Sequence, residues 1–277
     1  MTTVSGNQTL EKTTANAIRV LEFVGRGDVP VAAGADRPLV REQYVAEYVH
    51  GESGLEGPAL APPQSEAVGQ HAVDFLAERV LGCERPVTLV AVGPLTNVAL
   101  LLARHPEAAA RFERIVIMGG AIAEGNVTPA AEFNIWADPE AAARVFASGL
   151  EVTMIGLDVT HRALVTPAHA ERLRAGGRTG TMVAELLDYF GVFHRETYGF
   201  DGSPIHDAVA VAHVLRPGLV ETLPRHVAIE TGSELCRGRT VVDLWRRTGQ
   251  EPNAEVGVGI DAEAFVELLL ERIATFE

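Results

Sequence analysis

Short apolar runs alternate with segments of helical periodicity along most of this chain, and this alternation constrains the fold more than any other feature. The apolar runs end at Gly, Pro or Asn turns, and an amphipathic segment usually follows. This order is expected of a mostly parallel sheet covered by helices. The predicted strands are Val29–Ala33, Val87–Val92, Ile115–Met118, Val152–Ile155, Val227–Glu230 and Ala254–Ile260. We therefore predict an α/β fold with an open, mostly parallel sheet flanked by helices, formed by residues 1–277 as a single domain.

Several helices have recognisable beginnings. Asp138 is followed by Pro and Glu, which predicts an N-cap before a helix over Ala141–Ala147. Thr166 and the proline after it predict the same for Ala168–Arg174. Asp261 is expected to cap a final amphipathic helix.

Charge and cysteine content exclude several classes of protein. The formal net charge is -14, so nucleic acid and anionic membranes are not expected partners. Cys83 and Cys236 belong to no CxxC or Cys/His group, which argues against a disulfide framework or a structural zinc site. No secretory signal opens the sequence, and no apolar run reaches the ~18 residues of a membrane span. We expect a cytoplasmic protein.

A Gly-Pro turn at Val92–Asn97 follows a predicted strand and opens a predicted helix over Leu95–Arg104. It therefore belongs to the carboxyl end of the sheet, where open α/β folds bind their ligands. Turn chemistry alone favours a simpler interpretation, an ordinary tight βα turn in which Asn97 caps the helix or satisfies backbone groups.

Polar side chains are dense between Met118 and Asn134, without helical spacing. Asn126, Glu132 and Asn134 suit a polyhydroxylated ligand, because amides both donate and accept while a carboxylate accepts from two hydroxyls. The alternative is that they satisfy the backbone of their own loop.

His206 and Asp207 precede the apolar stretch Ala208–Leu215. Spacing alone favours Asp207 as the N-cap of a helix and His206 as a surface residue. In the functional alternative Asp207 binds a metal and His206 donates a proton, since imidazole is the side chain most readily charged near neutral pH.

Taken together and in this order, the motifs resemble those of the inosine-uridine-preferring nucleoside hydrolases. The six matching segments are Thr2-Thr-Val-Ser-Gly-Asn7, His50-Gly-Glu-Ser-Gly-Leu55, Gly93-Pro-Leu-Thr-Asn97, Met118–Asn134, Leu157-Asp-Val-Thr-His161 and His206-Asp207. They extend in register from about Thr2 almost to the C-terminus, so the chain is identified as a member of this family.

The resemblance implies a nucleoside hydrolase fold and cleavage of the N-glycosidic bond of ribonucleosides, which yields ribose and free base. It also implies a calcium ion that holds the nucleophilic water and two ribose hydroxyls, since calcium accepts six to eight oxygen ligands. The expected partner is a small-molecule ribonucleoside. Relatives commonly form dimers or tetramers, so a homodimer or homotetramer is expected.

The resemblance assigns roles residue by residue. It makes the Asp207 carboxylate and the Val92 backbone carbonyl metal ligands. The residues that it assigns to the ribose are Asn7, Met118, Asn126, Glu132 and Asn134.

Other residues are assigned to the base. His206 would protonate or steer the departing base, and His50 and Phe133 would lie near it. His194 and Tyr198 fall where the family keeps a mobile loop and helix end that close over the base. For these two, ordinary helix packing beside Phe190 and Phe193 is the alternative.

The family begins with a strand that ends in Asp-Thr-Asp-Pro-Gly-x-Asp-Asp, which supplies two metal carboxylates and the general base. Residues Thr2–Asn7 match the family's second strand, so we expect the first strand and helix, on the order of 30 residues, to be missing ahead of Met1. A misplaced start is favoured over a true short form.

The missing segment has two expected consequences. The calcium site of the chain as written would keep one carboxylate and lack a general base, so little hydrolysis is expected. The neighbours of the missing strand would face each other about 9–10 Å apart, with unpaired backbone groups. The alternative function is that of a catalytically inactive homologue that binds ribosides or a protein partner.

Overall fold

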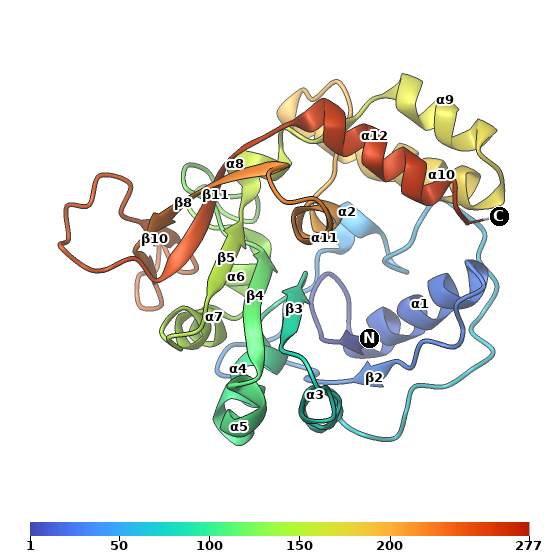
Figure 1. Ribbon diagram of the computed structural model, residues 1–277. Helices are drawn as coiled ribbons and strands as arrows, with labels where there is room; N and C mark the ends of the chain where they lie inside the picture. Colours follow the sequence, from blue (N-terminus) through green and yellow to red (C-terminus); the bar gives the residue numbers. More distant parts are fainter. Residues whose placement is uncertain (277) are drawn as a thin grey trace.

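The computed structural model describes residues 1–276 and is organised around a five-stranded sheet (Figure 1). Its strands, in spatial order, are β3 (Val87–Ala91), β4 (Phe112–Met118), β5 (Val152–Ile155), β11 (Ala254–Ile260) and β8 (Val220–Arg225). The first four run parallel, and β8 is antiparallel to β11. The predicted open and mostly parallel sheet is confirmed.

Helices cover both faces of this sheet. One layer contains α3 (Ala72–Leu81), α4 (Thr96–Arg104), α5 (Pro106–Ala109) and α7 (Pro139–Phe146). The other contains α9 (Pro167–Ala175), α10 (Arg178–Tyr198), α11 (Asp207–Leu215) and α12 (Ala262–Ile273). Strand β4 divides its side chains between them: Ile115 and Ile117 pack on the first layer, and Val116 and Met118 on the second. Such alternation follows from the two-residue period of a strand.

A second, small sheet lies at the N-terminus, where β1 (Thr2–Thr3) pairs in parallel with β2 (Ala32–Ala33). Helix α1 (Leu10–Phe23) follows β1. The predicted strand Val29–Ala33 therefore shortens to its last two residues. Among the described residues β1 is not paired with β3, which forms the edge of the central sheet. All five residues of β3 are only partly buried although most are apolar.

Asn97 connects the two sheets. Its Nδ2 donates to the carbonyl oxygen of Thr3 at 2.8 Å, and its Oδ1 accepts from the backbone N–H of Ala35 at 2.9 Å. The side chain is almost completely buried. Asn97 therefore satisfies backbone groups, as the simpler interpretation predicts, but these groups are remote in sequence, and its side chain does not cap α4.

The helix starts predicted from capping residues are confirmed. Asp138 accepts from the N–H of Ala141, Thr166 forms a capping box with His169, and Asp261 accepts from the N–H of Ala264. The capping interpretation of Asp207 is wrong: α11 begins at Asp207 itself, and no side chain caps it. Its carboxyl group is therefore not occupied by the helix N-terminus.

The strand predicted at Val227–Glu230 is wrong in its position. Residues Val227–Ile229 form β9, which pairs with β10 (Thr240–Val242) in an antiparallel hairpin outside the central sheet. The fifth place in the sheet belongs to β8, whose polar sequence and Pro224 concealed it. Proline is tolerated there because β8 is an edge strand and needs no donor on its outer side.

The remaining elements are short and lie outside the central sheet. They are α2 (Glu47–His50), α6 (Phe133–Ala137), α8 (Leu157–Thr160), β6 (Leu164–Val165) and β7 (Ser203–Pro204). Within residues 1–276, no helix has the length and apolar content needed to cross a membrane.

Candidate active site

A cavity of about 420 Å³ opens at the carboxyl end of the parallel strands. This volume falls in the range of about 300–1,000 Å³ that is usual for small-molecule sites. All the site residues predicted from the sequence line it, namely Asn7, His50, Val92, Met118, Asn126, Glu132, Phe133, Asn134, His194, Tyr198, His206 and Asp207. The tertiary structure thus brings together segments from almost the whole length of the chain.

The fold explains this convergence. Val92 follows β3 and Met118 ends β4, so two parallel strands of the central sheet bring these residues to one edge, and Asn7, which follows β1 of the small sheet, joins them in the cavity. His206 and Asp207 arrive at the start of α11, while α10 passes over the cavity with its C-terminal half.

Glu132 is a buried carboxyl group with several hydrogen bonds. Its Oε1 accepts from the N–H of Asn134 at 2.9 Å, and its Oε2 accepts from the N–H groups of Gly120 at 2.9 Å and Ile135 at 3.2 Å. Burial raises the pKa of Glu132 to about 7, although these backbone hydrogen bonds oppose the shift. Glu132 therefore satisfies its own loop and lines the cavity at the same time.

Two amides beside Glu132 are held in defined orientations. Asn126 Oδ1 accepts from the N–H of Phe133 at 2.9 Å, and Asn134 Nδ2 donates to the carbonyl oxygen of Met118 at 3.0 Å. These bonds leave the Asn126 amide nitrogen as a donor and the Asn134 amide oxygen as an acceptor without partners among the described residues. The polar part of the cavity thus offers both kinds of group.

His206 is held by a single side chain, because the Thr160 hydroxyl oxygen lies 2.8 Å from its Nδ1. Thr160 belongs to α8 and is fully buried. Burial is the largest cause that lowers the pKa of His206 to about 3, and the neighbouring His161, His194 and His50 contribute to the same shift. The ring is therefore neutral near pH 7, which suits a hydrogen-bonding role better than a cationic acid.

Asp207 is exposed on the cavity wall and makes no hydrogen bond with the described residues. Although solvent reaches it, desolvation by the surrounding protein and, second, the charge of Glu132 together raise the pKa of its carboxyl group to about 7. The direction of the shift follows from the geometry, but solvent access limits its energetic effect.

The described residues do not fit a calcium ion. Calcium takes six to eight oxygen ligands, several of them carboxylates. Within residues 1–276, no three His, Cys, Asp or Glu side chains gather as a metal site. Asp207 is one carboxylate, the Val92 carbonyl is a neutral ligand, and the oxygens of Glu132 already accept from backbone N–H groups.

The opposite side of the cavity is a wall of aromatic and imidazole rings. His50 stacks on Phe190 with ring centroids 5.6 Å apart and planes 27° apart, and Phe190 contacts His194 at 4.1 Å. Tyr198 lies 5.7 Å from His194. Burial lowers the pKa of His50 to about 4 and also lowers the pKa of His194. The wall is therefore uncharged at neutral pH and suited to stacking against a planar, uncharged ring.

Sequence reasoning missed part of this wall. Phe190 and Phe193 lie in the cavity lining, as do Tyr48 and Tyr189. The spacing of Phe190, Phe193 and His194 on one face of α10 was the available signal, but such a face is equally typical of core packing.

The sequence matches the family described as inosine-uridine preferring nucleoside hydrolase over residues 1–267. A pyrimidine-specific ribonucleoside hydrolase RihA from Shewanella sp. (strain ANA-3) is 51% identical over all of this chain and 87% of the relative. The protein of the same name from Klebsiella pneumoniae (strain 342) is 50% identical over all of this chain and 89% of the relative.

Solved structures agree with this match. A purine-preferring ribonucleoside hydrolase from Gardnerella vaginalis superposes with a TM-score of 0.92 at 32% identity, covering 99% of this chain and 89% of that one. A plant nucleoside hydrolase, the PpNRh1 enzyme, superposes with a TM-score of 0.89 at 33% identity, with the same coverage of 99% and 89%.

Proposed function

Because this chain belongs to the inosine-uridine preferring nucleoside hydrolase family, we propose that its cavity takes ribonucleosides with a pyrimidine base. By family the chain is a ribonucleoside hydrolase, which cleaves the N-glycosidic bond to give ribose and free base. The preference for pyrimidines rests on relatives about half identical over the whole chain, whose names state that specificity.

The polar side of the cavity is proposed to bind the ribose. Asn126 presents a free amide donor, Asn134 a free amide oxygen, and Glu132 a carboxyl group whose oxygens keep further acceptor capacity. Asn7 and Met118 complete this side. Vicinal hydroxyls both donate and accept, so a wall with both kinds of fixed group is complementary to them.

The ring wall is proposed to bind the base. Stacked rings such as His50 and Phe190 favour a planar heterocycle, and Phe133 and Tyr198 also line the cavity. His206 is proposed to steer the departing base by a hydrogen bond from its neutral ring, because burial opposes the cationic form. The close fit of rings around the base would also exclude water from that side of the glycosidic bond.

Calcium assistance, which the family resemblance implies, requires more oxygen ligands than the described residues supply. Asp207 and the carbonyl of Val92 are the groups we propose as part of such a site. One carboxylate and one carbonyl oxygen do not hold the ion by themselves.

The observation that carries the proposal is the convergence of all the predicted site residues on one cavity, with amides and a carboxylate on one side and rings on the other. The test is release of base and reducing sugar from uridine, cytidine, inosine and adenosine. We expect kcat/KM for the pyrimidine ribosides to exceed that for the purine ribosides by about tenfold or more. Faster cleavage of inosine than of uridine would refute the preference.

A His206→Gln variant tests the steering role with the same assay. We expect it to slow uridine hydrolysis about 10²-fold but to affect an activated aryl riboside far less, because a good leaving group needs no assistance. Equal losses on both substrates would remove His206 from this role.

The incomplete set of calcium ligands favours one second candidate function, that of a protein that binds ribosides without hydrolysing them. It predicts that uridine binds equally well with and without a calcium chelator, and that no base is released. Calorimetry beside the reducing-sugar assay separates the two functions. Measurable turnover that a chelator abolishes would refute this second candidate and our account of the metal ligands.

We also propose a homodimer or homotetramer. Leu235 and Trp245 lie in the segments flanking β10, and their side chains are 85% and 84% exposed. Large apolar side chains so exposed are typical of contact surfaces. Analytical ultracentrifugation of the wild type and of a Trp245→Ser variant tests this, and a monomeric wild type would refute it.

A further inference from the structure

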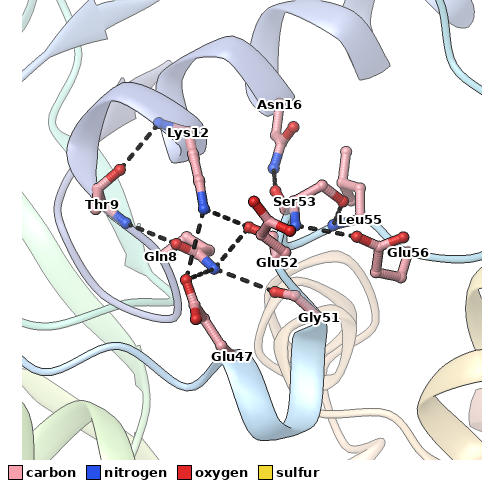
Figure 2. Close-up of polar contacts among 10 residues, drawn as sticks. All are labelled: Gln8, Thr9, Lys12, Asn16, Glu47, Gly51, Glu52, Ser53, Leu55 and Glu56. Carbon is pink, nitrogen blue, oxygen red and sulfur yellow. Dashed lines mark hydrogen bonds and ion pairs between the residues drawn. The ribbon is translucent and has the colours of Figure 1, made fainter.

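Three side chains, one just before α1 and two within it, donate hydrogen bonds to the backbone of a neighbouring loop. Gln8, Lys12 and Asn16 are spaced four residues apart and lie in one row, the α1 row (Figure 2). Each donates to the loop formed by residues 51–56, which follows α2. Lys12 and Asn16 lie within α1, where a spacing of four places them on one face. Gln8 lies just before the N-cap Thr9 and extends the row toward Gly51.

The contacts follow successive carbonyl groups. Gln8 Nε2 donates to the carbonyl oxygens of Gly51 at 3.1 Å and Glu52 at 2.9 Å. Lys12 Nζ donates to the Glu52 oxygen at 2.5 Å, and Asn16 Nδ2 to the Ser53 oxygen at 2.7 Å. Figure 2 shows these bonds side by side. Three consecutive carbonyl groups of a non-helical segment thus receive donors from one row of side chains.

The loop depends on these donors because its shape prevents regular pairing. Gly51 and Gly54 have φ angles of 74° and 78°, which only glycine adopts readily. A Cβ at Gly54 would lie 2.9 Å from Cγ of Gln8, so the loop is packed directly against that side chain. Gln8 itself is 1% exposed. A buried glutamine with satisfied donors is costly to replace and holds its partners in fixed places.

The same loop forms part of the cavity wall. Tyr48 and His50 precede it, and Gly54, Leu55 and Glu56 within it line the cavity. Asn7, on the proposed ribose side, is the residue next to Gln8. The α1 row therefore lies behind both sides of the cavity without being part of its lining.

We propose that Gln8, Lys12 and Asn16 are positioning residues, which hold loop 51–56 so that His50 keeps its stack against Phe190 and the base site stays formed. This inference rests on the proposed function, because it concerns the base site of that function. The three residues touch no substrate and act through the loop.

The test compares Gln8→Met and Lys12→Met with Lys12→Arg, which retains a donor, and with Glu11→Gln, an exposed residue on the same turn, as the control. Hydrogen exchange of the amides in residues 51–56 is measured in the whole protein. We expect exchange to become at least about tenfold faster in the two Met variants and to be unchanged in Lys12→Arg and Glu11→Gln. The ¹H–¹⁵N signals of the His50 ring should shift in the Met variants alone.

Uridine kinetics give the functional readout. We expect KM to rise about tenfold in Gln8→Met while kcat changes by less than about threefold, because the loop binds the base and does not touch the bond that breaks. If the wild type shows no turnover, the dissociation constant of uridine replaces KM. If the wild type binds no uridine at all, the proposed function fails, and the exchange and His50 signals still decide the present inference.

Two results would overturn it. Unchanged exchange in Gln8→Met would mean that the row does not hold the loop. Faster exchange with unchanged His50 signals would mean that the row stabilises the loop but does not position the base site. If Gln8→Met does not fold, Lys12→Met, at a half-buried position, decides by the same criteria.

Discussion

The hydroxyl of Thr160 lies 2.8 Å from Nδ1 of His206, and this contact joins the helix after β5 to the residue before α11. The Thr160 side chain is fully buried and bonds to no other acceptor among the described residues. We therefore expect the hydroxyl to donate to Nδ1, which leaves the proton of the neutral ring on Nε2. One buried hydroxyl would thus decide which nitrogen of His206 can donate to the base.

Thr160→Val tests this relationship. Valine keeps the shape of threonine but removes the donor, so both tautomers of His206 become populated. We expect kcat for uridine to fall about tenfold, with little change for an activated aryl riboside, and Thr160→Ser to restore most of the rate. Nitrogen chemical shifts of the ring report the tautomer directly. An unchanged tautomer in Thr160→Val would refute the assignment.

Phe190→Ala tests the ring wall. Loss of a stacking partner for a base costs about 1–3 kcal/mol, so we expect the KM for uridine to rise roughly five- to hundredfold while ribose binding stays the same. Val192→Ala is the matched control, because Val192 is on the same helix, 44% exposed and outside the cavity lining. Equal weakening of ribose and uridine binding would show that Phe190 supports the fold and not the base site.

The pKa of His50 predicts how stability depends on pH. This pKa is lowered from 6.5 to about 4 in the folded protein, so between those values the unfolded chain binds the extra proton. The contribution of His50 to the free energy of unfolding is therefore fully present above pH 6.5 and decreases as the pH falls toward 4. At 1.36 kcal/mol per pKa unit, the decrease is at most about 3 kcal/mol. Glu132, whose pKa is raised to about 7, has the opposite slope over much of this range.

Because His50 and Glu132 change the stability in opposite directions with pH, the effect of His50 has to be isolated with a variant. The variant His50→Gln has no imidazole to protonate, so it does not lose this stability at acid pH. Its free energy of unfolding relative to that of the wild type should therefore increase steadily from pH 7 to pH 4.5. Thermal unfolding of both proteins across this range measures it. A constant difference between them would mean that His50 titrates normally.

Asn97→Ala tests whether this residue is structural. The substitution leaves the N–H of Ala35 without its partner. It also removes one of two donors to the carbonyl of Thr3, which keeps the bond from the N–H of Gly34. We expect the free energy of unfolding to fall by about 1–3 kcal/mol, the cost of one unsatisfied buried group. Urea unfolding measures the change, with the exposed Gln250→Ala as control. A loss below about 0.5 kcal/mol would contradict the proposed connection between the two sheets.

Local sequence was sufficient where one short segment determines its own structure. Strands β5 and β11 were predicted with their exact bounds, and the caps at Asp138, Thr166 and Asp261 formed as expected. Local sequence was insufficient for β8. An edge strand tolerates polar residues and proline, and neither kind of residue predicts a strand.

For the site, too, some properties follow from the sequence and others only from the fold. The sequence by itself determined which residue types are available, since the predicted site residues from Asn7 to Asp207 all line the cavity. Only the tertiary structure decided their chemical state: the neutral ring of His206 depends on burial and on three other histidines distant in sequence. Likewise, only the structure placed the α1 row behind loop 51–56. Desolvation and long-range hydrogen bonds depend on distances that are set when remote segments pack together, and no local pattern encodes them.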